Sequence, residues 1–159
     1  SQGQLEFIRQ SAPGPGPARN LTESIPRQVD AVMSSSADRI NLENALQQFS
    51  DHWSPRIVAE LNGQHVKLAK FMGAFDWHSH PDEDEMFLVL DGEFVMEFRD
   101  KRVELKAGEM LVVPRGVEHR PVAEQECSVM MVEPAGLVNT GDAETSEKTT
   151  TGTWLTMED

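Results

Sequence analysis

Apolar and polar positions alternate from about residue 56 to residue 134, a period typical of β-strands. The runs that fit it are "RIVAEL", "QHVKLAKFM", "EMFLVL", "EFVMEF", "RVEL", "EMLVVP", "VEHRPV" and "SVMMVEP", the last two separated by "AEQEC". Roughly eight short strands with no helix between them favour an antiparallel sandwich or closed barrel over a βαβ sheet. We therefore predict an all-β antiparallel fold.

Two of the predicted turns have sequences suited to tight hairpins. Asn62-Gly63 and Asp91-Gly92 each separate two strand-like runs. A two-residue type I′ turn needs positive φ at both central residues, which Asn, Asp and Gly tolerate best. We predict one tight hairpin at each dipeptide.

One helical pattern precedes the strands. Asn41 suits the N-cap position, and Pro55 stops the pattern after "SDHWS". The apolar residues that recur at helical spacing are Leu42, Ala45, Leu46 and Phe49. We predict a short N-terminal helix of about two turns.

The two ends of the chain differ in composition from the predicted barrel. Residues 1–37 include "APGPGPARN", which has almost nothing to bury, so we interpret them as a tail or leader. Met33 is a plausible start, and the residues before it need not be native. Residues 38–136 form the predicted barrel with its helix. Residues 137–159 form a polar, extended tail, whose "WLTM" could anchor it to a groove.

Charge and composition argue against several classes of partner. The chain has 27 Asp and Glu against 14 Lys and Arg, a formal net charge of -13. Nucleic acid and anionic membrane surfaces attract basic proteins, so we expect neither as a partner. No apolar run reaches the roughly 18 residues of a membrane-spanning helix, and "SQGQLEFIRQ" contains no signal-peptide core. Cys127, the single cysteine, is interpreted as a buried structural thiol, and we expect a cytoplasmic protein.

The segment "WHSHPDEDE" holds the strongest chemical signal. On a strand, His78 and His80 point to the same face, about 6.5 to 7 Å apart, and can converge on one ion if the strand curves. Glu85 follows a short turn and begins the next predicted strand. It points to the same face of that strand as the apolar Phe87, which indicates an interior position. An interior carboxylate is costly unless it is paired or bound to a metal.

His119 is a fourth candidate ligand, because the tight turn "PRG" just before it could fix its direction. Three histidines and one glutamate suit iron, manganese, nickel, cobalt, copper or zinc, and the sequence does not choose among them. The alternative is that the histidines are surface or hydrogen-bonded core residues. His52 and His65 match no such pattern; both are interpreted as structural, with His65 on the surface.

Two stretches resemble the conserved motifs of the cupin superfamily. They are Gly73-x4-His78-x-His80-x4-Glu85-x6-Gly92 and Gly108-x5-Pro114-x-Gly116-x2-His119. The likeness extends over about residues 56–135. The spacing after Gly73 is one residue shorter than the usual family pattern, and Ala123 stands where an Asn often closes the second motif; neither is a ligand position.

The resemblance implies a small antiparallel jelly-roll barrel that holds one divalent metal inside by His78, His80, Glu85 and His119. The chain is also similar to short bacterial single-cupin proteins often labelled as mannose-6-phosphate-isomerase-like, a label that does not specify a reaction. Met86, Leu88 and Leu90 would leave an apolar outer face that the helix or a second subunit must cover. Because cupins commonly dimerise in this way, we expect a homodimer.

Other residues have weaker signals. Arg115, expected at the rim of the barrel, could bind a substrate carboxylate or phosphate, or be an ordinary turn arginine. The acids of "PDED" are interpreted as a solvated turn, and Trp77 as packing rather than pocket. The apolar residues that could line a pocket are Phe75, Trp77, Phe87, Phe94, Met96 and Phe98.

Four protein ligands leave an octahedral ion two open positions, an arrangement suited to chemistry. We therefore expect a small metal-dependent enzyme of the isomerase, lyase or dioxygenase type that acts on a small oxygenated molecule. The alternative is a non-catalytic binding or storage protein that holds a small-molecule ligand.

Overall fold

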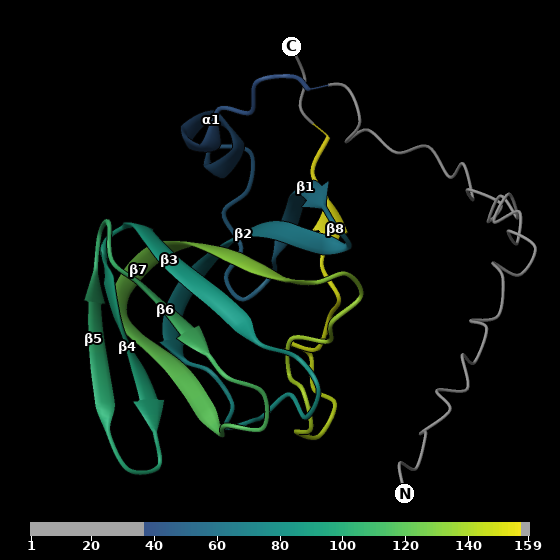
Figure 1. Ribbon diagram of the computed structural model, residues 1–159. Coiled ribbons are helices and arrows are strands. Elements are labelled where there is room, and N and C mark those ends of the chain that lie inside the picture. The colour runs from purple at the N-terminus through teal and green to yellow at the C-terminus, as the bar shows by residue number, and fades with distance from the viewer. Residues whose placement is uncertain (1–36, 157–159) are drawn as a thin grey trace, which may run out of the picture. The chain divides into compact units, whose positions relative to one another are not determined.

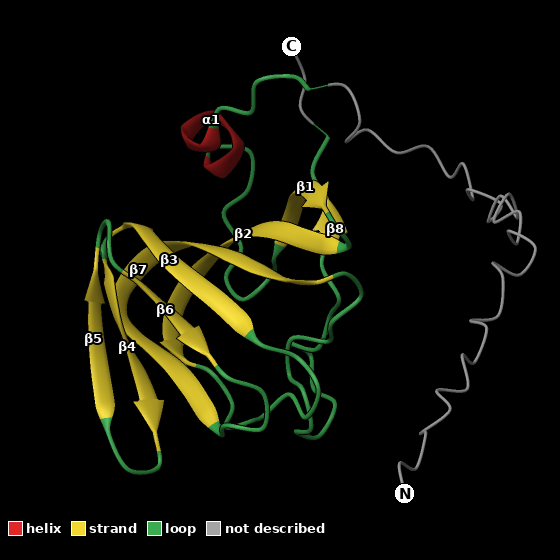
Figure 2. Ribbon diagram, viewed as in Figure 1, coloured by secondary structure: helices red, strands yellow, loops and turns green. Residues whose placement is uncertain are grey.

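The computed structural model describes residues 37–156, so the predicted leader, residues 1–37, lies outside the described residues except for its last one. The elements are α1 (Leu42–Leu46), β1 (Arg56–Leu61), β2 (Gln64–Ala74), β3 (Glu85–Asp91), β4 (Glu93–Phe98), β5 (Arg102–Lys106), β6 (Met110–Val113), β7 (His119–Pro134) and β8 (Thr153–Trp154). Figures 1 and 2 show the strands curving around one interior, with α1 outside. The predicted all-β jelly-roll barrel with a short N-terminal helix is confirmed.

The helix begins as its sequence predicts. The side chain of Asn41 accepts a hydrogen bond from the Asn44 N–H at 2.9 Å, which satisfies one of the free donors at the helix start. The helix is shorter than predicted, because it ends at Leu46 and leaves Phe49 beyond it. Phe49 is nevertheless buried, so the apolar spacing correctly identified the face that packs.

Strand β7 organises the sheet. It is one continuous strand of 16 residues, whereas the sequence predicted two strands separated by "AEQEC". One edge of β7 pairs with β2 over most of its length. The other edge is shared, because β4 pairs with the first part of β7 and β3 pairs with the last part.

Because β3 and β4 both pair with β7, one of the two predicted hairpins does not form. The turn at Asn62-Gly63 forms as expected, with φ values of 49° and 75°, and joins the paired strands β1 and β2. At the second site only Gly92 has positive φ, at 82°, and β3 and β4 pair with β7 rather than with each other. The chain therefore turns a corner at Asp91-Gly92 and passes from one part of β7 to another.

The interior and exterior faces of the barrel have separate apolar clusters. The interior cluster contains Phe71, Phe87, Phe94 and Met96, together with the free thiol of Cys127. Burial raises the pKa of that thiol to about 12, in keeping with the predicted structural role. Outside the barrel, α1 packs over Leu68, Leu90 and Met130, so the helix supplies part of the cover that the outer face needs.

The described part of the predicted C-terminal tail lies on the barrel. Thr153 and Trp154 form β8, which pairs in parallel with Arg56 and Ile57 of β1. The chain end is therefore attached as an edge strand rather than in a groove, and Trp154 is 44% exposed. The domain boundaries at residues 37 and 137 stay a prediction. Among residues 37–156, no helix is long and apolar enough to cross a membrane.

Replacing Gly92 by alanine tests the corner. A Cβ there would lie 2.9 Å from the Glu126 carbonyl oxygen, whereas a Cβ at Gly63, with a similar φ, meets no atom of the described residues within 4 Å. We expect Gly63→Ala to lower the free energy of unfolding by about 1 kcal/mol through backbone strain. Gly92→Ala should lower it by about 1–3 kcal/mol more because of the overlap. Equal losses for the two variants in denaturant unfolding would contradict the close approach.

Candidate metal centre

The four predicted ligands come from three places along the barrel. Glu85 is the first residue of β3 and His119 the first residue of β7, as predicted. His78 and His80 are not on a regular strand, contrary to expectation. They lie in an extended segment that makes a single bridge, in which the His78 N–H donates to the His119 carbonyl at 3.1 Å and the His119 N–H donates back at 2.9 Å.

The turn before β7 fixes His80 as well as His119. The N–H of Gly116 donates to the His80 carbonyl at 2.8 Å, and the N–H of Val117 donates to the Pro114 carbonyl at 3.2 Å. The positive φ of 75° at Gly116 explains why glycine suits this turn. The second motif therefore holds the backbone of the first.

The four side chains converge inside the barrel. Their nearest nitrogen and oxygen atoms all lie within 4.8 Å of one another, and all four residues are buried. An oxygen of the Glu85 carboxyl, Oε1, lies 2.8 Å from the Nε2 atom of His80 and 3.3 Å from that of His119. The structure thus brings together all four residues that the sequence selected.

Two backbone carbonyls orient the imidazole rings. The Nδ1 atom of His78 donates to the Asp76 carbonyl at 2.8 Å, and the Nδ1 atom of His119 donates to the Val117 carbonyl at 2.8 Å. In a neutral imidazole bonded in this way, the Nε2 atom carries the lone pair and is free to bind a metal. Both rings therefore present a ligand atom to the centre.

The electrostatics of the site keep its ligands in metal-binding form. Burial lowers the pKa of His78 to about 4, and the neighbouring His119 adds to this shift, so the imidazole stays neutral at ordinary pH. Burial alone would raise the pKa of Glu85. The adjoining rings of His119 and His80 outweigh burial and hold that pKa below its usual range, so the carboxylate stays ionised.

The unpaired atoms of the site test whether a cation fits it. The Nε2 atoms of His80 and His119 and the Oε1 atom of Glu85 are buried, and within the described part of the chain they have no hydrogen-bond partner of good geometry. Buried acceptors that face one another without a donor are costly, and a shared cation would satisfy all of them. This buried group can therefore hold a divalent metal, whose identity the nitrogen and oxygen ligand set leaves open.

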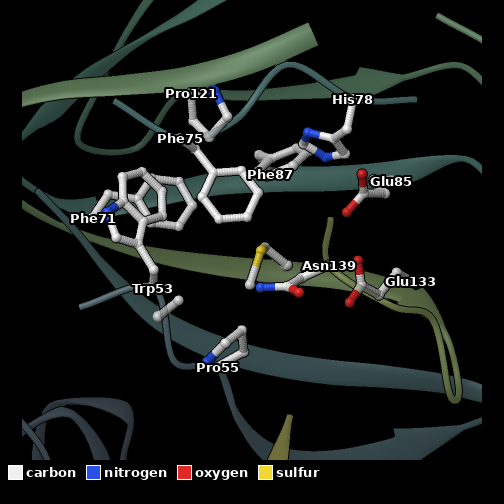
Figure 3. A pocket seen from close by; sticks show the side chains of 12 residues that line it. Trp53, Pro55, Phe71, Phe75, His78, Glu85, Phe87, Pro121, Glu133 and Asn139 are labelled. Atoms are coloured by element: carbon white, nitrogen blue, oxygen red, sulfur yellow. The ribbon is translucent and has the colours of Figure 1, made fainter. Parts of the chain in front are cut away.

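A small cavity of about 30 Å³ is lined by two of the four residues, His78 and Glu85. Figure 3 shows its aromatic side, formed by Trp53, Phe71 and Phe75, and its polar side, where the carboxyl groups of Glu85 and Glu133 lie. The remaining lining residues are Pro55, Ala69, His78, Phe87, Pro121, Met131 and Asn139. Of the six pocket residues predicted from sequence, Phe75 and Phe87 line this cavity and the others do not.

Two charged residues of the interior were missed by the sequence analysis. Lys67 is 1% exposed and Glu133 is 2% exposed, and the Nζ atom of Lys67 donates to Glu133 Oε1 at 2.6 Å. Lys67 points to the same face of β2 as the buried Ala69 and Phe71, and this alternation could have placed it in the interior. The interpretation of His65 as a surface residue is wrong, because its side chain is only 12% exposed.

Glu133 also faces the carboxyl group of Glu85. Burial raises the pKa of Glu133 well above its usual value, the neighbouring Glu85 adds to the rise, and Lys67 opposes it. The two acids are therefore in opposite situations: the histidines hold Glu85 ionised, whereas burial beside that charge disfavours a second one.

Several other predicted residues lie away from the cavity. Arg115 is exposed and bonds to Asp84, with its Nε atom 3.3 Å from the Asp84 carboxylate, so it does not line the cavity, and its role as a substrate contact stays a prediction. The guanidinium carbon of Arg99 lies 3.9 Å from the centre of the Trp77 ring. Trp77 therefore packs outside the cavity, as predicted. Asp82 and Asp84 of the acidic turn are exposed, in agreement with the solvated-turn interpretation.

The segment after β7 holds the backbone between two of the histidines. The carboxylate of Asp142 accepts hydrogen bonds from the Ser79 N–H at 2.6 Å and the Ser79 hydroxyl at 2.9 Å. The Asp142 N–H donates back to the Ser79 carbonyl at 3.0 Å. A Cβ at Gly141 would lie 2.2 Å from that carbonyl oxygen, so this approach requires glycine. No sequence motif pointed to Asp142, because the contact spans 63 residues.

Comparisons with known proteins agree with this description. A family model described as "Cupin domain" matches residues 64–133. The uncharacterized protein YdbB of Bacillus subtilis is 39% identical over 89 residues, which cover 55% of this chain and 76% of YdbB. The crystal structure of a cupin-2 domain containing protein from Shewanella frigidimarina has a TM-score of 0.59 and 48% identity, and the match covers 60% of this chain and 93% of that one.

One relative has a named activity. An acireductone dioxygenase of Yarrowia lipolytica is 37% identical over 65 residues, which cover 38% of this chain. The match spans only 37% of that enzyme's length, so it relates one part of each protein.

Removing the Asp142 carboxylate tests the contact that supports the two histidines. We expect Asp142→Ala to lower the free energy of unfolding by about 1 kcal/mol, since its hydrogen bonds to Ser79 are lost at an exposed position. Glu144→Ala, which removes an exposed acid from the same segment, should change it by less than about 0.5 kcal/mol. Denaturant unfolding measures both, and equal values for the two variants would show that the contact does not stabilise the fold.

Proposed function

The chain belongs to the cupin superfamily, and we propose that it is a small enzyme that uses one divalent transition metal to act on a small oxygenated molecule. The observation that supports this most directly is the buried group of His78, His80, Glu85 and His119, whose unpaired acceptor atoms face one another. His78, His80 and His119 would bind the metal through Nε2, and Glu85 would bind it through its carboxylate.

Four protein ligands leave two positions open on an octahedral ion. The bound metal would supply Lewis acidity toward a carbonyl or enediol or, if redox-active, a site for dioxygen chemistry. The protein's own contribution is to hold the ligands. Asp76 and Val117 carbonyls orient two rings, and the aromatic side chains of Trp53, Phe71 and Phe75 limit the water that reaches the centre.

By this proposal, the protein is an isomerase, a lyase or a dioxygenase. The similarity of one segment to acireductone dioxygenase from Yarrowia lipolytica supports the dioxygenase class. Since a shared fold hosts many reactions, the substrate of that enzyme is not transferred to this chain.

A non-catalytic binding or storage protein is the alternative function. The small size of the cavity favours it, because about 30 Å³ holds about two water molecules and little more. In this alternative the metal centre would retain a small ligand without converting it.

Metal analysis of untagged protein tests the metal centre. We expect about one divalent metal per chain, bound by wild-type protein and by His52→Ala, whose histidine pairs with Glu126 outside the site. His80→Ala should lose the metal and should no longer gain thermal stability from added Mn, Fe, Ni or Zn, because one of four ligands is missing.

The outcomes separate the two functions. The metal centre would be contradicted if wild-type protein binds no divalent metal and its melting temperature does not change when any of the four ions is added. Protein that binds metal but neither consumes oxygen nor converts any member of a small-metabolite panel would favour the binding protein over the enzyme.

A homodimer through the outer face of β6 and β3 is the second part of the proposal. Met110 and Val112 of β6 are 55% and 51% exposed, and they lie opposite Leu88 and Met86 of β3. Together these side chains form an apolar patch that α1 leaves open, a common sign of an interface.

Light scattering coupled to size-exclusion chromatography tests the dimer. We expect wild-type protein to have about twice the monomer mass and Met110→Glu to shift toward the monomer, since a charge in an apolar interface is costly. Met72→Glu, at an exposed methionine on β2, should stay dimeric. A wild-type monomer at micromolar concentration would contradict this part of the proposal.

A further inference from the structure

The buried pair of Lys67 and Glu133 adjoins the metal centre. Lys67 lies on β2 and Glu133 on β7, and both side chains point into the barrel with exposures of 1% and 2%. The Lys67 ammonium holds one oxygen of Glu133, Oε1, at 2.6 Å. The pair is therefore removed from water.

The second oxygen of Glu133 has no hydrogen-bond partner of good geometry among residues 37–156, although it is buried. Glu133 lines the same cavity as His78 and Glu85, and Figure 3 shows both carboxyl groups on the polar side, across from the aromatic rings. The other polar side chain beside it, Asn139, is already engaged, because its Nδ2 donates to the Lys148 carbonyl and its Oδ1 accepts from the Thr150 N–H, each at 2.8 Å.

A buried ion pair contributes little net stability to a barrel, because the cost of removing both groups from water offsets their attraction. Replacing both partners of such a pair by well-packed apolar residues is often neutral or stabilising. The neighbours of Lys67 and Glu133 on the interior face, Ala69 and Met131, are apolar, so an apolar pair would continue the core. The charged pair is therefore better explained by what its free oxygen binds than by stability.

We propose that Glu133, held by Lys67, is a specificity-determining residue that hydrogen-bonds a hydroxyl group of the ligand at the open positions of the metal. This inference rests on the proposed metal centre. A hydroxyl both donates and accepts, so it suits the free oxygen whether or not the carboxyl is protonated. A carboxylate or phosphate at this end of the cavity would face two acids, so the ligand class is a small, hydroxylated molecule that is uncharged at this end.

The cavity is consistent with this class. Its volume of about 30 Å³ leaves room beside the metal for a group of few atoms. The arginine that the sequence suggested as an anion partner, Arg115, is exposed and bonded to Asp84 instead. No arginine is among the residues that line the cavity.

Cobalt(II)-loaded protein and two small probe ligands test the inference. Hydroxylamine, a neutral ligand with a hydroxyl group, is titrated under anaerobic conditions against azide, an anion that only accepts hydrogen bonds. Binding is followed by the visible absorption of the cobalt ion. The variant is Lys67→Met/Glu133→Leu, which removes both partners of the buried pair together. Glu133→Leu alone would leave the Lys67 ammonium buried and unpaired, so the double variant is the one that separates ligand binding from folding.

We expect the double variant to melt no lower than wild-type protein and to bind cobalt within a few-fold of it. Its affinity for hydroxylamine should fall about ten-fold, the effect of one lost hydrogen bond to a buried group. Its affinity for azide should stay the same or rise, because a repelling carboxyl is gone. The wild-type preference for hydroxylamine over azide should therefore be lost.

Three other outcomes would overturn the inference. Affinities for both probes that change by the same factor, or a hydroxylamine affinity that does not change, would overturn the role of Glu133 while leaving the metal centre intact. Wild-type protein that binds no cobalt would overturn the metal centre and this inference together. A double variant that unfolds at a markedly lower temperature would show that the ion pair has a structural role, and would also count against the inference.

Discussion

The carboxylate of Glu85 must be neutralised inside the barrel, and the surrounding structure is organised around this requirement. An ionised carboxylate that is buried without partners costs several kcal/mol, of order 5 or more. Here it faces the Nε2 atoms of His80 and His119 at 2.8 and 3.3 Å, and backbone carbonyls turn the rings of His78 and His119 so that their Nε2 atoms face the centre. A divalent cation would satisfy the charge and the lone pairs at once.

The barrel topology is what brings the four residues to one point. β6 pairs with β3, with Val113 opposite Glu85, so the turn after β6 brings His119, the first residue of β7, to the start of β3 at one end of the interior. β7 in turn accepts β3 and β4 on one edge. The corner at Gly92 makes this possible, since no larger residue fits so close to the backbone of Glu126. At that end, the bridge between His78 and His119 and the hydrogen bonds from Asp142 to Ser79 hold the remaining loop. Ligand geometry therefore depends on backbone contacts more than on side-chain packing.

The sequence predicted the fold class and the four converging residues because both depend on local patterns, namely strand alternation and motif spacing. It failed where one strand competes with another for a partner: Asp91-Gly92 suits a hairpin, but β7 pairs with both of its flanking strands. It also missed Lys67 and Glu133, since charged residues are rarely buried unless paired and these two partners lie 66 residues apart in the chain. The contact of Asp142 could not be predicted, because it joins residues that only the folded chain brings together.

Anomalous diffraction from a crystal grown with a first-row divalent metal, measured on both sides of the absorption edge of that metal, tests the central claim most directly. We expect one peak inside the barrel, bonded to the Nε2 atoms of His78, His80 and His119 and to the carboxylate of Glu85, at about 2.0–2.2 Å. A crystal that diffracts well and shows no peak between these residues, or shows the metal bound only elsewhere, would contradict it.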